Sequence, residues 1–256
     1  MIPLKDNIPT ENVPVLTIAL IVMNVLMFFF FQDPDLSLSG ATVDNDNVID
    51  YGAIPYEITH PGDQCDLPGQ PADVACSDGG GGPATWLTLL TSMFMHGGIL
   101  HIAGNMLFLW IFGNNIEDAM GRIKFILFYI GGGLAATFLQ VLIDTNSTVP
   151  SIGASGAVAA VLGAYAILYP RARVVTLIII IVFITVIELP ALLVLGLWFL
   201  MQLYYGSSEL TQPVAGAGVA YWAHIGGFLF GLALVKLLAR RENPNYGSYN
   251  PRPGIY

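Results

Sequence analysis

Two side chains that could act together as nucleophile and base lie in apolar stretches far apart in the sequence. Ser155 opens the stretch 156–169, and His224 lies within 219–238. A serine hydroxyl is a weak nucleophile until a neighbouring base takes its proton, and histidine is the usual base because its pKa lies near neutrality. Polar groups are costly in membrane-type segments, so both are candidates for function.

The residues around Ser155 favour stabilisation of an oxyanion. Gly153 and Gly156 allow a sharp turn into a helix, and the free N–H groups at the start of that helix would point at the space beside the serine oxygen. His101 and Asn105 are four residues apart on one predicted helix face, so they can add side-chain donors. These residues together predict acyl transfer through an oxyanion hole.

Helix rise places these candidates at a similar depth. We count about 1.5 Å per residue from the charged residue at the far end of each stretch. Asn105 and His224 lie roughly 18 Å from that end along the helix, and Ser155 lies roughly 24 Å from it. All three fall in the outer half of a hydrocarbon core about 30 Å thick. Random placement would seldom bring three distant groups to one level.

Each residue alone also has a structural interpretation. The Gly-x-Ser-Gly pattern is common where membrane helices pack closely, and a single membrane His or Asn can simply hydrogen-bond a neighbouring helix. His96 and His101 could begin a metal site, but no carboxylate or cysteine lies near them at ligand spacing. We therefore expect neither a metal nor a cofactor, and the conjunction of residues favours catalysis.

The composition requires a membrane protein. Of the 256 residues, 55% are hydrophobic and only 11% are charged, which excludes an ordinary soluble domain. The net charge of −9 argues against a nucleic-acid partner. Long apolar runs without the alternating pattern of a barrel predict helices.

The apolar runs predict an all-α bundle of six transmembrane helices. The membrane domain covers 15–241, after a short N-terminal segment at 1–14 and before a tail at 242–256 that is predicted to be disordered. The predicted spans are 15–31, 99–116, 123–143, 156–169, 190–206 and 219–238.

The distribution of charge predicts the topology. None of the nine basic residues lies between Gln32 and Gly121, whereas ten of the eighteen acidic residues lie between Asp33 and Asp78. By the positive-inside rule, both termini are cytoplasmic and the loop 32–84 is outside.

The segment 174–189 must then be interfacial or re-entrant. The number of crossings between Arg173 and the outside loop 207–218 must be odd, and the segment 174–206 is too short for three, so there is one. Pro190 is well placed to begin that helix. The β-branched residues of 174–189 favour a small hairpin. One long helix kinked at Pro190 is the alternative.

Cys65 and Cys76 both lie in the predicted outside loop. A disulfide between them is plausible in an oxidising compartment, and two free thiols are the alternative.

Three motifs in this order resemble the rhomboid family of intramembrane serine proteases. They are His96-x4-His101-x3-Asn105, Gly153-Ala154-Ser155-Gly156 and Ala223-His224-x2-Gly227-x3-Gly231. The resemblance runs from about Trp86 to Leu238.

The resemblance implies a role for each of these residues. Ser155 would be the nucleophile, His224 the general base, and His101 and Asn105 the oxyanion-hole side chains. His96 would support the mouth of the active site. Gly227 and Gly231 would pack the sixth span against the fourth, and the helix beginning at Pro190 would correspond to the mobile fifth helix of the family.

Two positions depart from the family pattern. The family often has Trp-Arg before the first histidine, whereas here Trp86 is followed by Leu87, so that loop must be anchored differently. Ala159 stands where many members carry an aromatic ring that stacks on the catalytic histidine. The sequence therefore leaves open which residue supports His224.

We thus expect an endopeptidase with a Ser-His dyad, because no Asp or Glu lies in the outer half of a span. Its substrates would be single-span membrane proteins within the lipid bilayer, cleaved near the outer face of the plasma membrane. The alternatives are an inactive rhomboid-like protein that binds membrane clients and, on weaker grounds, a metal or proton transporter. The sequence does not indicate an oligomeric state.

Overall fold

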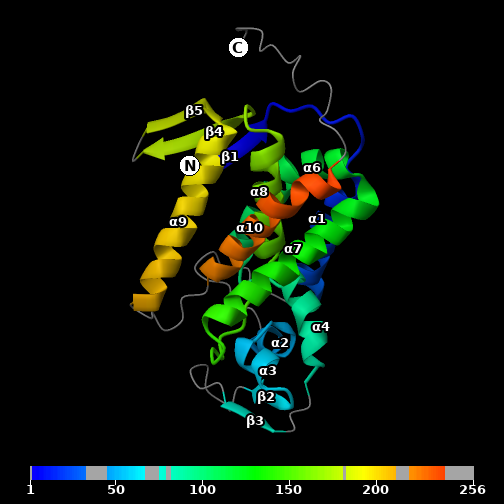
Figure 1. Cartoon of the computed structure of the whole chain (residues 1–256), viewed down its shortest axis with the longest axis vertical. Coiled ribbons are helices and arrows are strands. Elements are labelled where there is room, and N and C mark those ends of the chain that lie inside the picture. Colours follow the sequence, from blue (N-terminus) through cyan, green and yellow to red (C-terminus); the bar gives the residue numbers. More distant parts are fainter. Residues whose placement is uncertain are drawn as a thin grey trace.

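The computed structural model describes residues 2–32, 45–66, 75–78, 82–180, 183–211 and 219–239. Helices α1 to α10 form an elongated bundle, with a small sheet at one end and short elements at the other (Figure 1). We call these the sheet end and the loop end. The predicted disordered tail, 242–256, lies outside the described residues.

The elements follow in chain order. They are β1 (Ile2–Asp6), α1 (Val15–Leu26) continued by the π-helical turn η1 (Met27–Phe31), α2 (Asn45–Tyr51), α3 (Pro55–Thr59), β2 (Asp63–Asp66), β3 (Ala75–Asp78), α4 (Thr85–Thr91), η2 (Ser92–Phe94), α5 (Ile99–Phe108), η3 (Leu109–Gly113), α6 (Asn114–Met120), α7 (Arg122–Ile143), α8 (Ser155–Leu168), β4 (Arg173–Ile180), β5 (Phe183–Pro190), α9 (Ala191–Thr211) and α10 (Tyr221–Leu238).

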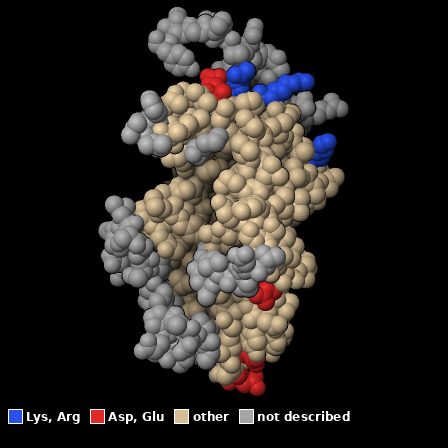
Figure 2. All heavy atoms as spheres, turned by 90° about the vertical axis from the view of Figure 1, so that its left-hand side faces the viewer, with Lys and Arg blue, Asp and Glu red and all other residues tan. Residues whose placement is uncertain are grey.

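Four helices in the described ranges are long and apolar enough to cross a membrane. They are Ile99–Met120, which joins α5, η3 and α6, then Arg122–Ile143, Ala191–Leu210 and Tyr221–Leu238. The other two predicted spans correspond to the shorter apolar helices Val15–Phe31 and Ser155–Leu168. On the face drawn in Figure 2, Lys and Arg are confined to the sheet end.

Helix α8 lies at the centre of the bundle, where it contacts α7, α9 and α10. Every residue from Gly156 to Tyr165 is buried. Small residues make this possible, because a Cβ on Gly227 of α10 would overlap the carbonyl oxygen of Gly156, and one on Gly231 would overlap that of Ala160. Glycine at these positions lets the two backbones approach closely.

The segment after α8 is a β-hairpin, as the β-branched residues favour. Strands β4 and β5 pair antiparallel from Arg173–Pro190 to Ile180–Phe183, and β1 pairs with the other edge of β4. The alternative of one long kinked helix is therefore wrong. Pro190 ends β5 and α9 begins at Ala191, so the predicted helix start was one residue early.

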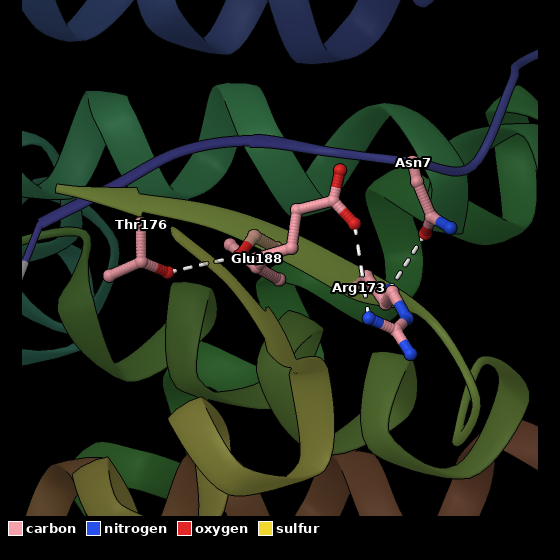
Figure 3. Close-up of polar contacts among 5 residues, drawn as sticks. Asn7, Arg173, Thr176 and Glu188 are labelled. Carbon is pink, nitrogen blue, oxygen red and sulfur yellow. Dashed lines mark hydrogen bonds and ion pairs between the residues drawn. The ribbon is translucent and has the colours of Figure 1, made fainter. Parts of the chain in front are cut away.

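Side-chain contacts strengthen the sheet (Figure 3). Arg173 donates its backbone N–H to Asn7 Oδ1 at 2.8 Å, and its guanidinium lies 4.0 Å from the carboxylate of Glu188. Thr176, which is fully buried, donates its hydroxyl to the carbonyl of Val174 at 3.1 Å. The bond to Asn7 joins the N-terminal segment to the hairpin, and the other two contacts lie within the hairpin itself.

A buried carboxylate caps the first apolar helix. Glu117 of α6 accepts hydrogen bonds from the backbone N–H groups of Leu16 and Thr17, at 3.0 and 2.7 Å, and from the Thr17 hydroxyl at 2.8 Å. These N–H groups have no partner within their own helix, and a negative charge at a helix N-terminus is favourable. The start of α1 is thereby fixed to α6.

The loop end contains α2, α3 and the β2–β3 hairpin (Figure 1). Cys65 and Cys76 face each other on β2 and β3 and form a disulfide, so the free-thiol alternative is wrong. Ala53 makes a two-way backbone bridge to Ser151, just before α8. This part of the chain therefore supports the segment that leads to Ser155.

Candidate functional site

The hydroxyl of Ser155 and the ring of His224 are in direct contact. Ser155 is the first residue of α8, and His224 lies in the first turn of α10. Ser155 Oγ is 2.7 Å from His224 Nε2. The two residues are 69 positions apart in the sequence and meet because glycines bring α8 and α10 into close contact. A hydrogen bond of this kind is the contact that a serine nucleophile and its base would require.

The turn before Ser155 requires glycine at position 153. Gly153 has φ of +122°, and its N–H donates to the carbonyl of Ser92 at 2.8 Å. A Cβ at this position would lie 2.8 Å from His101 Nε2 and 3.5 Å from Ser155 Oγ. Both the positive φ and the lack of space exclude a side chain at this position. Because His101 Nε2 and Ser155 Oγ both lie close to the same point, His101 lies beside the serine.

His101 is held in a form that can donate from the side facing Gly153. The backbone N–H of Gly97 donates to His101 Nδ1 at 3.2 Å. A neutral imidazole that accepts at Nδ1 carries its hydrogen on Nε2. The Nε2–H group is thus available to an oxygen atom near Ser155.

Asn105 lies one turn further along α5, and α5 contacts α8. It is 8% exposed, and within the described residues its Nδ2 atom has no hydrogen-bond partner. A buried, unpaired donor is costly unless it has a use. Such a donor is what an oxyanion hole requires.

His96 supports His101 from the loop end. It is fully buried, and its ring meets that of His101 edge to face with centroids 5.1 Å apart. Gln32, at the end of η1, exchanges two hydrogen bonds with the His96 backbone, at 2.8 and 3.1 Å. The sequence analysis did not identify Gln32, although a polar residue ending an apolar span was a usable signal.

Gly156 and Gly227 serve packing. The position of a Gly156 Cβ is already taken by Ala136 of α7, and Gly227 lies against the Gly156 carbonyl. These two glycines therefore set the distance between α7, α8 and α10 on which the contact between Ser155 and His224 depends.

Two residues of α9 support His224, a role that the sequence analysis left open. Gln202 Oε1 lies 2.8 Å from His224 Nδ1, and the ring of Trp198 lies 5.7 Å from the imidazole with an interplanar angle of 36°. Ala159 of α8 has no ring to offer. Gln202 is a polar residue in a predicted span, so the rule that identified His101 and Asn105 also applied to it.

A small cavity adjoins Ser155. Its volume is about 20 Å³, and Ser92, Gly153, Ser155 and Ala223 are among the residues that line it. A space of this size can hold one water molecule.

Within the described ranges, no three His, Cys, Asp or Glu side chains are grouped so that they could hold a metal ion.

Comparison with known proteins gives a consistent result. The family model for the Rhomboid domain matches residues 83–241. The mitochondrial presenilin-associated rhomboid-like protein A of Danio rerio is 30% identical over 174 residues, which cover 62% of this chain and 40% of that protein. Rhomboid protease GluP of Bacillus subtilis is 28% identical over 151 residues, covering 59% and 24%. RHOMBOID-like protein 5 of Arabidopsis thaliana is 30% identical over 166 residues, covering 64% and 47%.

The similarity includes every predicted site residue but not the whole of each relative. The matched residues 83–241 contain the three motifs described above. The chain spans between a quarter and a half of the length of these relatives.

Proposed function

Because the chain belongs to the rhomboid family and is a multi-pass integral membrane protein, we propose that it is an intramembrane serine endopeptidase. Its substrates would be membrane proteins with a single span, cleaved within or beside the transmembrane segment. The observation that carries the proposal is the 2.7 Å contact between Ser155 Oγ and His224 Nε2 inside an apolar helix bundle.

The first step would be attack by serine. His224 Nε2 accepts the Ser155 proton while Ser155 Oγ forms a bond to the carbonyl carbon of the substrate. The carbonyl oxygen becomes an oxyanion, which the N–H groups at the start of α8, His101 Nε2–H and Asn105 Nδ2 would stabilise. The protonated His224 then gives its proton to the leaving amine as the peptide C–N bond breaks.

The second step would be hydrolysis of the acyl-enzyme. A water molecule, for which the cavity beside Ser155 offers room, gives a proton to His224 Nε2 and attacks the ester carbon. The bond to Ser155 Oγ then breaks, and His224 returns the proton to Ser155. This sequence uses only groups of the chain and one water, and it needs neither metal nor cofactor.

The proposed topology places the active site towards the outer side of the membrane. All lysines and arginines of the described residues lie at the sheet end, and they are Lys5, Arg122, Lys124, Arg171, Arg173 and Lys236. The positive-inside rule makes this end cytoplasmic. Ser155 is at the end of α8 that points away from the sheet end. The 14 residues of α8 span only about 21 Å of a hydrocarbon core about 30 Å thick. The serine would then lie below the outer surface.

This orientation predicts six crossings with both termini inside. The loop end, with its disulfide, would face an oxidising compartment. The plasma membrane fits these features, and it is the location that we propose.

Covalent labelling and cleavage together test the function. We expect a fluorophosphonate to label purified wild-type protein, and we expect the protein in liposomes to cleave members of a panel of single-span substrates. Ser155→Ala and His224→Ala should abolish cleavage, and the double variant should be no slower than either single one. Cleavage by Ser155→Ala would refute the mechanism, and a wild type that is neither labelled nor active would favour a client-binding protein.

A further inference from the structure

We infer that Gln202 is a positioning residue that fixes the tautomer and orientation of His224. This inference rests on the proposed function, because it assigns a role within the same site. It concerns a residue of α9, whereas Ser155 and His224 belong to α8 and α10. The contact in question is the 2.8 Å separation between Gln202 Oε1 and His224 Nδ1.

The orientation of the Gln202 amide follows from its other contact. Gln202 Nε2 lies 3.1 Å from the backbone carbonyl of Trp198. A carbonyl oxygen can only accept, so the NH₂ group must face Trp198 and the amide oxygen must face His224. Gln202 is buried, with 6% of the residue exposed, and no other orientation of its amide would satisfy both contacts.

The orientation of the amide determines where His224 carries its hydrogen. An amide oxygen can only accept, so His224 must donate from Nδ1. In the neutral imidazole this leaves Nε2 with a free lone pair, which faces the Ser155 hydroxyl at 2.7 Å. Three hydrogen bonds thus run in one direction, from Ser155 to His224, from His224 to Gln202 and from Gln202 to Trp198. The base is held in the one tautomer that can accept the serine proton.

A glutamine suits this location better than a carboxylate would. A charged group within an apolar bundle is costly, whereas a neutral amide makes the same hydrogen bond without that cost. The third residue of a Ser-His-Asp triad also orients its histidine through the Nδ1–H group. Gln202 would supply the orientation but not the negative charge.

Trp198 supplies a second support from the same helix. It is four residues before Gln202, so both side chains lie on one face of α9. Its ring contacts both His224 and Phe228 of α10, with centroids 5.7 and 6.1 Å apart. The support that an aromatic ring on α8 would give is absent at Ala159, and α9 takes over this role.

Three variants of α9 separate positioning from packing. Gln202→Met keeps the approximate shape but removes the acceptor, and we expect kcat to fall about 10- to 100-fold with KM little changed. Gln202→Glu, as a neutral carboxyl, can accept from His224 through its carbonyl oxygen and donate to the Trp198 carbonyl through its O–H group, so it should keep most of the rate. Tyr204→Leu, at an exposed position two residues away, is the control and should behave like wild type.

Nitrogen-15 NMR of the histidine rings supplies a readout that does not depend on activity. The chain has four histidines, and His224→Ala assigns the relevant signals. We expect the Nδ1–H tautomer for His224 in wild type and in Gln202→Glu, and a mixture of tautomers in Gln202→Met.

Two results would overturn the inference. One is an Nε2–H tautomer in wild type, which can be measured even if a variant does not fold. The other is a Gln202→Met protein with the tautomer and kcat of wild type. If wild type shows no cleavage and no fluorophosphonate labelling, the proposed function fails, while the NMR result still decides the role of Gln202.

Discussion

At the scale of single residues, His224 is defined by what lies on either side of it. Ser155 contacts one ring nitrogen and Gln202 the other, at 2.7 and 2.8 Å. The sequence motif identifies the serine and the histidine but says nothing of the glutamine, which lies 22 residues before His224 on a different helix. The motif names two side chains, whereas in the structure three side chains, Ser155, His224 and Gln202, are joined by hydrogen bonds.

Asn105→Ala tests the oxyanion hole. We expect kcat to fall about 10²- to 10³-fold, because one donor to the developing oxyanion is lost while the serine and its base remain. The measurement is single-turnover cleavage of a membrane-embedded substrate in liposomes. Thermal unfolding in detergent serves as the control for folding. A rate equal to that of wild type would exclude Asn105 from the oxyanion hole.

At the scale of elements, we propose two roles for α9 that are hard to separate. It contacts His224 through Trp198 and Gln202, and, as the counterpart of the mobile fifth helix of the family, it would move aside when a substrate enters from the lipid. Trp198 and Phe199 are partly buried and pack against the core. Because Trp198 contacts His224, only Phe199 is suitable for a test of gating alone.

Phe199→Ala should speed the cleavage of membrane-embedded substrates. Phe199 stacks on Phe228 of α10 with ring centroids 4.5 Å apart, and this contact holds α9 against its neighbour. Aromatic pairs of this kind contribute about 0.5 to 1.5 kcal/mol beyond the area they bury, so their loss should favour displacement of α9. The measurement is the cleavage rate of a single-span substrate in liposomes.

A small soluble ester or peptide provides the comparison for this variant. It can reach Ser155 from the aqueous side, so its rate should change little. Leu200→Ala, at a neighbouring position that is 59% exposed, is the matched control. If both substrates change in the same proportion, or neither changes, α9 is not the gate, and substrate entry through the outside loop becomes the alternative.

At the scale of the whole molecule, the two ends of the bundle differ in structure and in charge. The sheet end holds all the basic residues of the described ranges, and the loop end holds the disulfide-linked hairpin (Figures 1 and 2). The N-terminal strand is tied into the sheet end through Asp6, which accepts hydrogen bonds from Tyr165 of α8 and Asn115 of α6 at 2.6 and 2.7 Å.

Accessibility of introduced cysteines tests the proposed orientation. In a chain whose two native cysteines are replaced by serine, a cysteine at position 46 should react with an impermeant thiol reagent from outside. A cysteine at position 173 should react only after permeabilisation, because the positive-inside rule makes the sheet end cytoplasmic. Reaction at position 173 in intact cells would overturn the topology.

The pH dependence of stability tests the role of Asp6. Burial raises the pKa of Asp6 to about 6, from an ordinary value of 3.8. The folded state therefore binds the proton more tightly than the unfolded state does, so stability should fall as pH rises from about 4 to about 6 and stay level above. The full difference is about 3 kcal/mol.

Asp6→Asn should remove this dependence, since the amide oxygen can accept the same two hydrogen bonds without a charge. Thermal unfolding in detergent at pH 4.5 and pH 7.5 measures the effect. We expect the melting temperature of the variant, relative to that of wild type, to be higher at pH 7.5 than at pH 4.5. An equal pH response in both proteins would show that Asp6 does not titrate in this window.

The sequence predicted which side chains can do chemistry and which segments are apolar. Both follow from properties of single residues, such as the cost of a polar group in lipid and the pKa of an imidazole, together with the order of motifs along the chain. The pattern also predicted the hairpin at 174–189, because β-branched residues disfavour a helix there.

The contacts between distant segments could be identified only in the folded chain. Three contacts illustrate this: the pairing of β1 with β4, the disulfide between Cys65 and Cys76, and the contacts of Trp198 and Gln202 with His224. Each joins segments that are separated in the sequence, and the sequence alone does not show that their side chains face one another. The physical reason is that the rotation and tilt of each helix depend on close packing of its neighbours. At Gly227 that packing is set by the absence of a single Cβ, and its partner on the fourth span was predicted from the resemblance to a family and not from the local pattern of small residues.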